Sequence, residues 1–263
     1  GEVAWAMDEF HSMETSDMVG PRNGGGLQAR REVLVKPLVL LVLLSGCSFF
    51  EGLVGDDGKA NVEAADAALQ AGDLPEAAAK FDAAVAGNPA NIEAATGAAA
   101  MALMRGDTAK ADEILAAVQA TAGEREGEIL MRRALVAQRA GDFDKVWQFG
   151  KASNLAPGLL MAGEAMLAEG ERGEARELLA SVSGELESTA TKYIELIDHE
   201  NPICAGLSEA QALWALGARK VAVRSVGDLL PRFPEKRTDR DFLLLTWAGR
   251  AASVGESAIG MTL

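Results

Sequence analysis

Few residues of this chain have the types and spacing that catalysis requires. The sequence holds two histidines, and only His199 lies beyond residue 46. A His/Asp/Ser relay would have to use it, and one histidine cannot form a histidine-rich metal site. Asp198 and Asn201-Pro202 around it predict a helix end, where a cation is mildly stabilising. We therefore expect His199 to serve the fold, with no catalytic residue, metal or cofactor in the chain.

A cysteine near the start of the chain has a more distinctive setting. The run KPLVLLVLLSGC (36–47) joins a basic residue, a short apolar stretch and Ser45-Gly46 to Cys47. The stretch is too short for a spanning helix, which needs about 20 apolar residues. Small residues let the backbone enter a processing enzyme in extended form, where the thiol is the nucleophile for lipidation. The run resembles the signal peptide and lipobox of bacterial lipoproteins.

This resemblance implies a lipidation site at Cys47 and removal of residues 1–46 as a signal peptide with an upstream extension. Residues 1–17 are acidic, unlike a signal n-region, so Met18 is a better start. The resemblance also implies a diacylglyceryl group and an N-acyl chain, and stable anchoring takes two or more such chains. Ser48 in second position favours the outer membrane, so we expect a lipid-anchored protein that faces the periplasm.

The glycine-rich segment after Cys47 fails as a phosphate-binding loop. Gly52 and Gly58 enclose five residues instead of four, and Ala60 stands where the motif needs a hydroxyl after Lys59. We interpret residues 47–58 as a lipidated flexible tether.

Charge and cysteine content narrow the function further. The chain carries 25 basic and 39 acidic side chains, a net charge of −14. Nucleic-acid binding needs clustered Lys and Arg, so no nucleic-acid partner is expected. Anionic lipids would not attract such a chain, which leaves membrane binding to the acyl anchor. With Cys47 lipidated, Cys204 has no disulfide partner in the mature chain, and we expect it to be packed among apolar residues.

Glycines recur between Ala-rich helical stretches at spacings of 34, 35, 29 and 47 residues. The first two spacings match the period of about 34 residues of a helical repeat. Each glycine supplies the left-handed residue that ends one helix, and the aspartate that follows the first three can cap the next helix. The five glycines are Gly72, Gly106, Gly141, Gly170 and Gly217.

Small side chains also recur at fixed distances from these glycines. They lie seven residues before each one and, in four of five cases, five residues after it; the other is Val146. Two helices approach closely only where such side chains cross. Larger apolar residues lie nine residues after four of the glycines, at Phe81, Leu115, Leu179 and Val226. In the third unit Gly150 occupies this position, and a helix shorter by one residue would bring Phe149 there.

The pattern resembles the tetratricopeptide repeat, over about 58–260. It implies an all-α solenoid of about five helix–turn–helix units over residues 59–260, with a C-terminal capping helix. Residues 184–206 exceed one period and predict an extra helix or a kink before Pro202. Residues 239–254 predict the last helix, either a cap or the first helix of a sixth unit. A plain helical bundle is the alternative fold; a sheet is not indicated.

In the tetratricopeptide family the first helix of each repeat lines a concave groove that binds peptides or helices. Met and Trp side chains on such a face suit an adaptable apolar contact, and packing between helices is the alternative role. The resemblance implies a partner-binding groove with a protein or peptide partner. Its candidate residues are Leu69, Met104, Met131, Leu135, Arg139, Leu160 and Trp214.

The favoured hypothesis is a non-enzymatic, membrane-anchored scaffold for protein–protein interaction in envelope assembly. The chain is similar to pilotin-type lipoproteins in its 34-residue spacing and to the repeat lipoprotein of the β-barrel assembly machinery in LLPRFP (229–234). One alternative is a periplasmic carboxylate-dependent hydrolase, motivated only by acidic runs such as 124–128 and 185–187, which solvated helix faces explain as well. The other is a cytosolic adaptor with an uncleaved apolar N-terminus.

Overall fold

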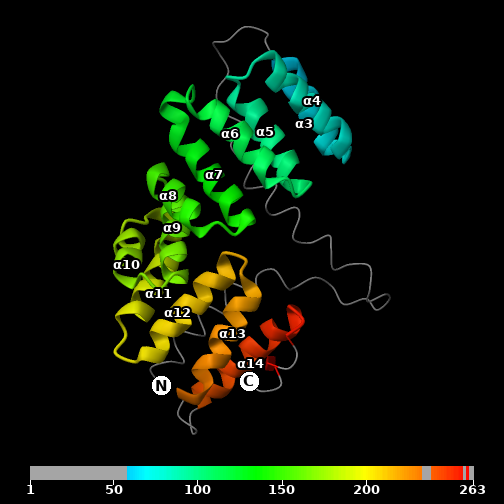
Figure 1. Ribbon diagram of the computed structural model, residues 1–263. Coiled ribbons are helices and arrows are strands. Elements are labelled where there is room, and N and C mark those ends of the chain that lie inside the picture. The colour runs from blue at the N-terminus through cyan, green and yellow to red at the C-terminus, as the bar shows by residue number, and fades with distance from the viewer. Residues whose placement is uncertain (1–57, 233–237, 257–258, 261–263) are drawn as a thin grey trace. The chain divides into compact units, whose positions relative to one another are not determined.

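The computed structural model describes residues 58–232, 238–256 and 259–260, with the side chains of 238–243 left out (Figure 1). All regular structure in these ranges is helical. Cys47, the predicted signal segment 1–46 and nearly all of the predicted tether 47–58 lie outside the described residues. The chain divides into two compact units with a boundary between residues 145 and 146, and each is described by itself.

The N-terminal unit consists of helical hairpins stacked in chain order. Helices α3 and α4 form the first hairpin and α5 and α6 the second; α4 packs on α5, and α6 packs on α7. Their bounds are α3 Lys59–Ala71, α4 Leu74–Gly87, α5 Ile92–Met104, α6 Thr108–Gln119, the 3-10 turn η1 Gly123–Arg125, and α7 Glu126–Ala140. Helix α8, Phe143–Ser153, begins in this unit and continues into the next.

The C-terminal unit contains two further hairpins and one helix outside the repeat. Hairpin α9–α10 is followed by α11, which packs between α10 and α12, and then by hairpin α12–α13 and α14. The bounds are α9 Ala156–Ala168, α10 Arg172–Ala180, η2 Gly184–Leu186, α11 Glu187–Asp198, α12 Pro202–Ala215, α13 Arg219–Leu229, η3 Leu230–Arg232 and α14 Thr238–Ser253. The all-α fold of tetratricopeptide type predicted from the sequence is therefore confirmed.

The five predicted turn glycines all have the left-handed conformation, with φ between 74° and 88°. At each turn the amide after the glycine donates to the carbonyl five residues earlier, as Asp73 does to Ala68 at 2.8 Å. These bonds satisfy carbonyls that the helix end leaves free. The predicted caps also form: Asp73, Asp107 and Asp142 accept hydrogen bonds from amides three residues on, at 3.0 to 3.2 Å.

A sixth turn of the same kind follows α14. Gly255 has φ 78°, and the amide of Glu256 donates to the carbonyl of Ala251 at 2.9 Å. The amide of Gly260 then donates to Glu256, as the first turn of a second helix requires. Of the two roles predicted for residues 239–254, α14 thus has the geometry of the first helix of a sixth unit.

The predicted small side chains lie where the helices cross. The position five residues after each turn glycine is fully buried in every unit: it holds Ala77, Ala111, Val146, Ala175 and Ala222. Phe81 packs against Gly97 of the next hairpin so closely that a Cβ there would lie 2.3 Å from its ring. Stacking, and not the single hairpin, therefore buries the larger side chains.

The predicted one-residue shift to Phe149 is wrong. Gly150 keeps the repeat position and is buried. The backbone of α9 lies so close that a Cβ on Gly150 would be 2.4 Å from the carbonyl oxygen of Gly158. This unit thus uses close backbone approach where the other units use a large side chain. For the stretch 184–206 the prediction of an extra helix is confirmed, because α11 lies within it. Asn201 then caps α12 by accepting a hydrogen bond of 3.0 Å from the amide of Ile203.

Candidate functional site

The seven predicted groove residues all lie on first helices of hairpins or, for α7, on the corresponding helix. Leu69, Met104, Met131, Leu135 and Arg139 belong to the N-terminal unit. Met104 and Arg139 are exposed and the other three are half-buried. Leu160 and Trp214 lie on α9 and α12 of the C-terminal unit and are half-buried. One groove shared by all seven remains a prediction.

In the N-terminal unit the repeat spacing places matching residues of α3, α5 and α7 in rows. Two of the predicted residues pack on the unit's own core: Leu69 and Leu135 contact the apolar cluster that includes Ala65, Phe81 and Leu115. They therefore contribute to packing as well as to the face. The rows are Lys59, Glu93 and Glu128; Val62, Thr96 and Met131; Asp66, Ala100 and Leu135; and Leu69, Leu103 and Gln138.

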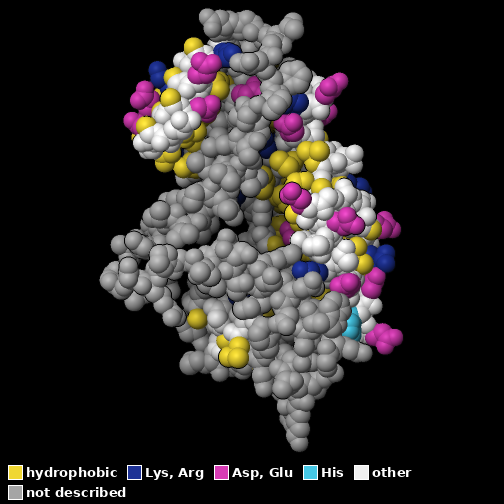
Figure 2. All heavy atoms as spheres, turned by 180° about the vertical axis from the view of Figure 1, so that it is seen from behind, with side chains coloured by type: hydrophobic (Ala, Val, Ile, Leu, Met, Phe, Trp, Pro, Cys, Tyr) yellow, Lys and Arg dark blue, Asp and Glu magenta, His cyan; other side chains and the backbone are white. Residues whose placement is uncertain are grey.

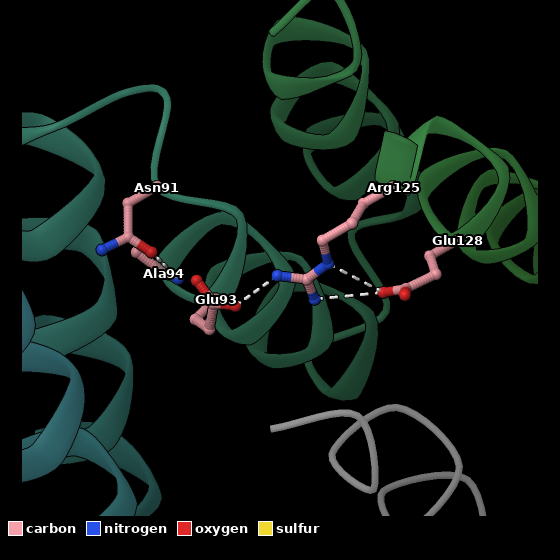
Figure 3. Close-up of polar contacts among 5 residues, drawn as sticks. All are labelled: Asn91, Glu93, Ala94, Arg125 and Glu128. Carbon is pink, nitrogen blue, oxygen red and sulfur yellow. Dashed lines mark hydrogen bonds and ion pairs between the residues drawn. The ribbon is translucent and has the colours of Figure 1, made fainter. Parts of the chain in front are cut away.

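Arg125 joins the first of these rows. Its guanidinium donates to Glu128 at 3.0 and 3.2 Å and also to Glu93, so that it lies between the N-terminal ends of α5 and α7 (Figure 3). Asn91 starts α5 by accepting from the amide of Ala94 at 2.9 Å (Figure 3). Because Glu93 and Glu128 both serve this link, they fix the spacing of two first helices and are not free carboxylates of an active site.

A second arginine joins α6 to α7. Arg133 donates to both oxygens of Asp112, at 2.7 and 3.2 Å, and to Gln119 at 2.8 Å. Gln119 in turn donates to Glu126 at 3.0 Å. A bidentate guanidinium pair restricts orientation more than a single contact does. Together with Arg125, Arg133 holds α7 in a fixed register against the preceding hairpin.

In the C-terminal unit a buried acid, Glu164, lies on α9 at the repeat position of Asp66 and Leu135. Glu164, 8% exposed, accepts a hydrogen bond of 3.1 Å from the hydroxyl of Tyr193 on α11. Burial raises the pKa of Glu164 to about 7, and the Tyr193 hydrogen bond offsets part of that rise. The pKa of Tyr193 is raised by its own burial and by Glu164. The extra helix α11 thus covers this part of α9.

Trp214 is covered by the unit's own side chains. The ring of Trp247 on α14 meets it edge-on at 6.0 Å, and the guanidinium of Arg250 lies 4.9 Å from the Trp214 ring and 4.5 Å from the Trp247 ring. Arg250 also donates to Gln211 at 2.8 Å, and Arg219 stacks on Trp214 at 5.2 Å. Such cation–π contacts stabilise a packed interface. Trp214 therefore serves packing between α12 and α14 on at least one side.

Sequence reasoning missed these partners but held a signal for them. Six residues before the turn glycines lie Asp66, Ala100, Leu135, Glu164 and Gln211. Three of the five are polar, which is unusual for a helix position that is buried or half-buried in every repeat. Counting that position across the repeats would have indicated where polar contacts lie. It would not have identified Tyr193 or Arg250, because α11 and the tail of α14 have no counterpart in the earlier repeats.

The remaining candidates have structural roles. His199 ends α11, and its Nδ1 accepts from the amide of Asn201 at 3.0 Å. Cys204 is buried on α12, as expected, and burial raises the pKa of its thiol. Across the described ranges, no three His, Cys, Asp or Glu side chains gather where a metal ion could bind. Nor does any helix in those ranges combine the length and apolar character needed to cross a bilayer.

Helical hairpins with these turns and crossings define the class of fold, and comparison with known proteins adds one likeness. No protein-family model matches the chain, and no curated protein matches it. Among solved structures, the chain is similar to PilF of Pseudomonas aeruginosa, a protein that has been characterised functionally. The identity is 16% over 78% of this chain and 87% of that chain, with a TM-score of 0.44. The fold is assigned from the hairpin geometry above, independently of this likeness.

Proposed function

We propose that this protein is a scaffold that binds a polypeptide along the first helices of its hairpins, held at a bacterial envelope membrane by lipid on Cys47. The observation that carries the binding half is the face of the N-terminal unit. There Met104 and Arg139 are exposed, and Leu69, Met131 and Leu135 on the same set of helices are half-buried. An adaptable methionine and an exposed cation on a face with apolar side chains suit a peptide or helix.

The rigidity of this face supports the same proposal. Arg125 and Arg133 hold α7 against the preceding hairpin, so the α5 and α7 residues of this face are positioned before a partner arrives. A preformed surface loses less entropy on binding than one that must order itself. On the face that Figure 2 shows, acidic side chains lie among apolar and basic ones, which suits a partner that carries charge more than a wholly apolar substrate.

The anchoring half of the proposal rests on the sequence around Cys47. Removal of residues 1–46 and acylation would place the array at the outer membrane, facing the periplasm, for a role in envelope assembly. Intact-mass analysis of protein extracted from membranes tests this. A chain that starts at Cys47 and carries added acyl mass supports it. A chain that keeps its apolar N-terminus without acyl mass contradicts it and favours an adaptor outside the envelope.

The binding half is tested by a pull-down with the anchor intact. A non-repeat lipoprotein of similar abundance is the matched control, because it shares the lipid and the membrane but lacks the helical face. Recovery of a polypeptide specific to the repeat protein supports the proposal. Recovery of nothing above the control contradicts it.

A further inference from the structure

One carboxylate on the predicted binding face, that of Asp66, has no partner among the residues that the structure describes. Asp66 lies on α3 between Val62 and Leu69, at spacings of four and three residues that place all three on one side of a helix. All three are half-buried, and both apolar neighbours pack against the core cluster of the N-terminal unit. Asp66 is therefore a charge set into an apolar stripe.

Nothing among the described residues neutralises that charge. Asp66 makes no ion pair or hydrogen bond with any residue that the structure describes, and burial alone raises its pKa. The cation two turns away on the same helix, Lys59, lies 3.9 Å from Glu63, and both of those side chains are exposed. A partly desolvated carboxylate without a counter-ion is unfavourable, and an incoming cation would relieve the cost.

The C-terminal unit shows how the same repeat position is satisfied from within. Glu164, the residue equivalent to Asp66, accepts a hydrogen bond from the hydroxyl of Tyr193. Gln211, at the same repeat position, accepts one from the guanidinium of Arg250. Those donors come from α11 and α14. In the described part of the N-terminal unit no helix supplies a donor to Asp66, so its position is open to a donor from another molecule.

We infer that α3 docks a basic amphipathic segment of the partner, with a Lys or Arg that pairs with Asp66 and apolar side chains that contact Val62 and Leu69. This inference rests on the proposed function and adds the chemistry of the partner. The charge of the unit agrees, because residues 58–145 hold nine basic and fourteen acidic side chains, a net −5. Long-range attraction would bring a basic segment to this unit, and Asp66 would fix its register.

Two synthetic peptides test the inference. Both are labelled helices of ~18 residues with the same apolar stripe, and they differ only in a central Lys or Glu within that stripe. Their affinities for the full chain carrying Cys47→Ser are measured by fluorescence anisotropy. We expect the Lys peptide to bind about tenfold more tightly than the Glu peptide, a preference that falls as salt is added.

Two variants locate the effect. Asp66→Asn should reduce the preference for the Lys peptide to within about twofold of none. Asp82→Asn, an exposed site on α4, removes the same net charge and should leave the preference unchanged. An unaltered preference in Asp66→Asn, equal losses in both variants, or no binding of either peptide up to about 1 mM would overturn the inference. Circular dichroism confirms that each variant is folded.

The same pull-down used for the proposed function separates the two claims. If the parent chain captures a polypeptide and Asp66→Lys captures it equally well, the inference of a basic segment at Asp66 is wrong, and the proposed polypeptide-binding function is still supported. If no variant captures a polypeptide, the scaffold itself is wrong. Capture by the parent and by Asp82→Asn, with loss in Asp66→Lys, supports both.

Discussion

Replacing Glu164 with glutamine isolates an electrostatic cost inside the C-terminal unit. The carboxyl of Glu164 is buried and accepts a hydrogen bond of 3.1 Å from Tyr193. Burial raises its pKa from 4.5 to about 7. Glutamine keeps the shape and can still accept the tyrosine hydrogen bond, but it does not ionise. The substitution therefore removes the titration while it leaves the packing in place.

The sign and size of the effect follow from linkage. A carboxyl with a higher pKa in the folded state holds its proton more tightly there, so folding is favoured at low pH. Stability then falls as the pH rises from 4.5 through about 7, and it levels off above. The difference between 4.5 and about 7, at about 1.4 kcal/mol per pKa unit, corresponds to about 3 kcal/mol. At pH 8, Glu164→Gln should be more stable than the parent by roughly that amount.

Urea unfolding at pH 5 and pH 8 measures this effect. We expect the parent to lose about 2 kcal/mol of unfolding free energy between the two pH values and Glu164→Gln to lose less than about 1. Glu195→Gln on the exposed face of α11 is the control, because it removes the same charge without a buried carboxyl. Equal pH dependence in the parent and Glu164→Gln, or lower stability of the variant at pH 8, would show that burial of Glu164 does not destabilise its charged form.

Three further predictions concern the repeat itself. Gly97→Ala should lower the unfolding free energy by about 1–3 kcal/mol, because its Cβ would meet the Phe81 ring; Gly87→Ala, with open space around it, should not, and urea titration compares them. Asp107→Ala should cost about 1 kcal/mol in the same assay by removing the cap of α6, whereas Asp107→Asn should cost much less. In the Cys47→Ser chain, Cys204 should react with a disulfide reagent only as the protein unfolds, because its thiol is buried and its pKa raised; fast reaction of the native protein would contradict this.

The turns could be predicted from the sequence because their cause is local. A left-handed glycine and a capping aspartate act within a few residues, so Gly72-Asp73 carries the same information in any fold. The small crossing residues followed for the same reason, since they repeat with the turn. Gly255 was not included, although its turn lies 38 residues after Gly217, close to the repeat period.

The contacts of the face could not be predicted in the same way. Tyr193 reaches Glu164 from a helix that has no place in the period, and Arg250 reaches Gln211 across 39 residues. Arg125 lies among acidic residues whose pattern predicts a solvated face, yet it joins two of the first helices. Long-range polar pairs depend on tertiary placement, which a spacing pattern alone does not specify.

Site-specific photo-crosslinking in cells tests whether the first helices bind a polypeptide. A crosslinking residue at Met104, on the exposed edge of α5, probes the predicted binding face, and one at Ala79, exposed on α4, probes a second helix of the same unit. We expect a discrete crosslinked polypeptide from Met104 in intact cells and none from Ala79. Equal crosslinking from both positions, or none from Met104, would contradict it.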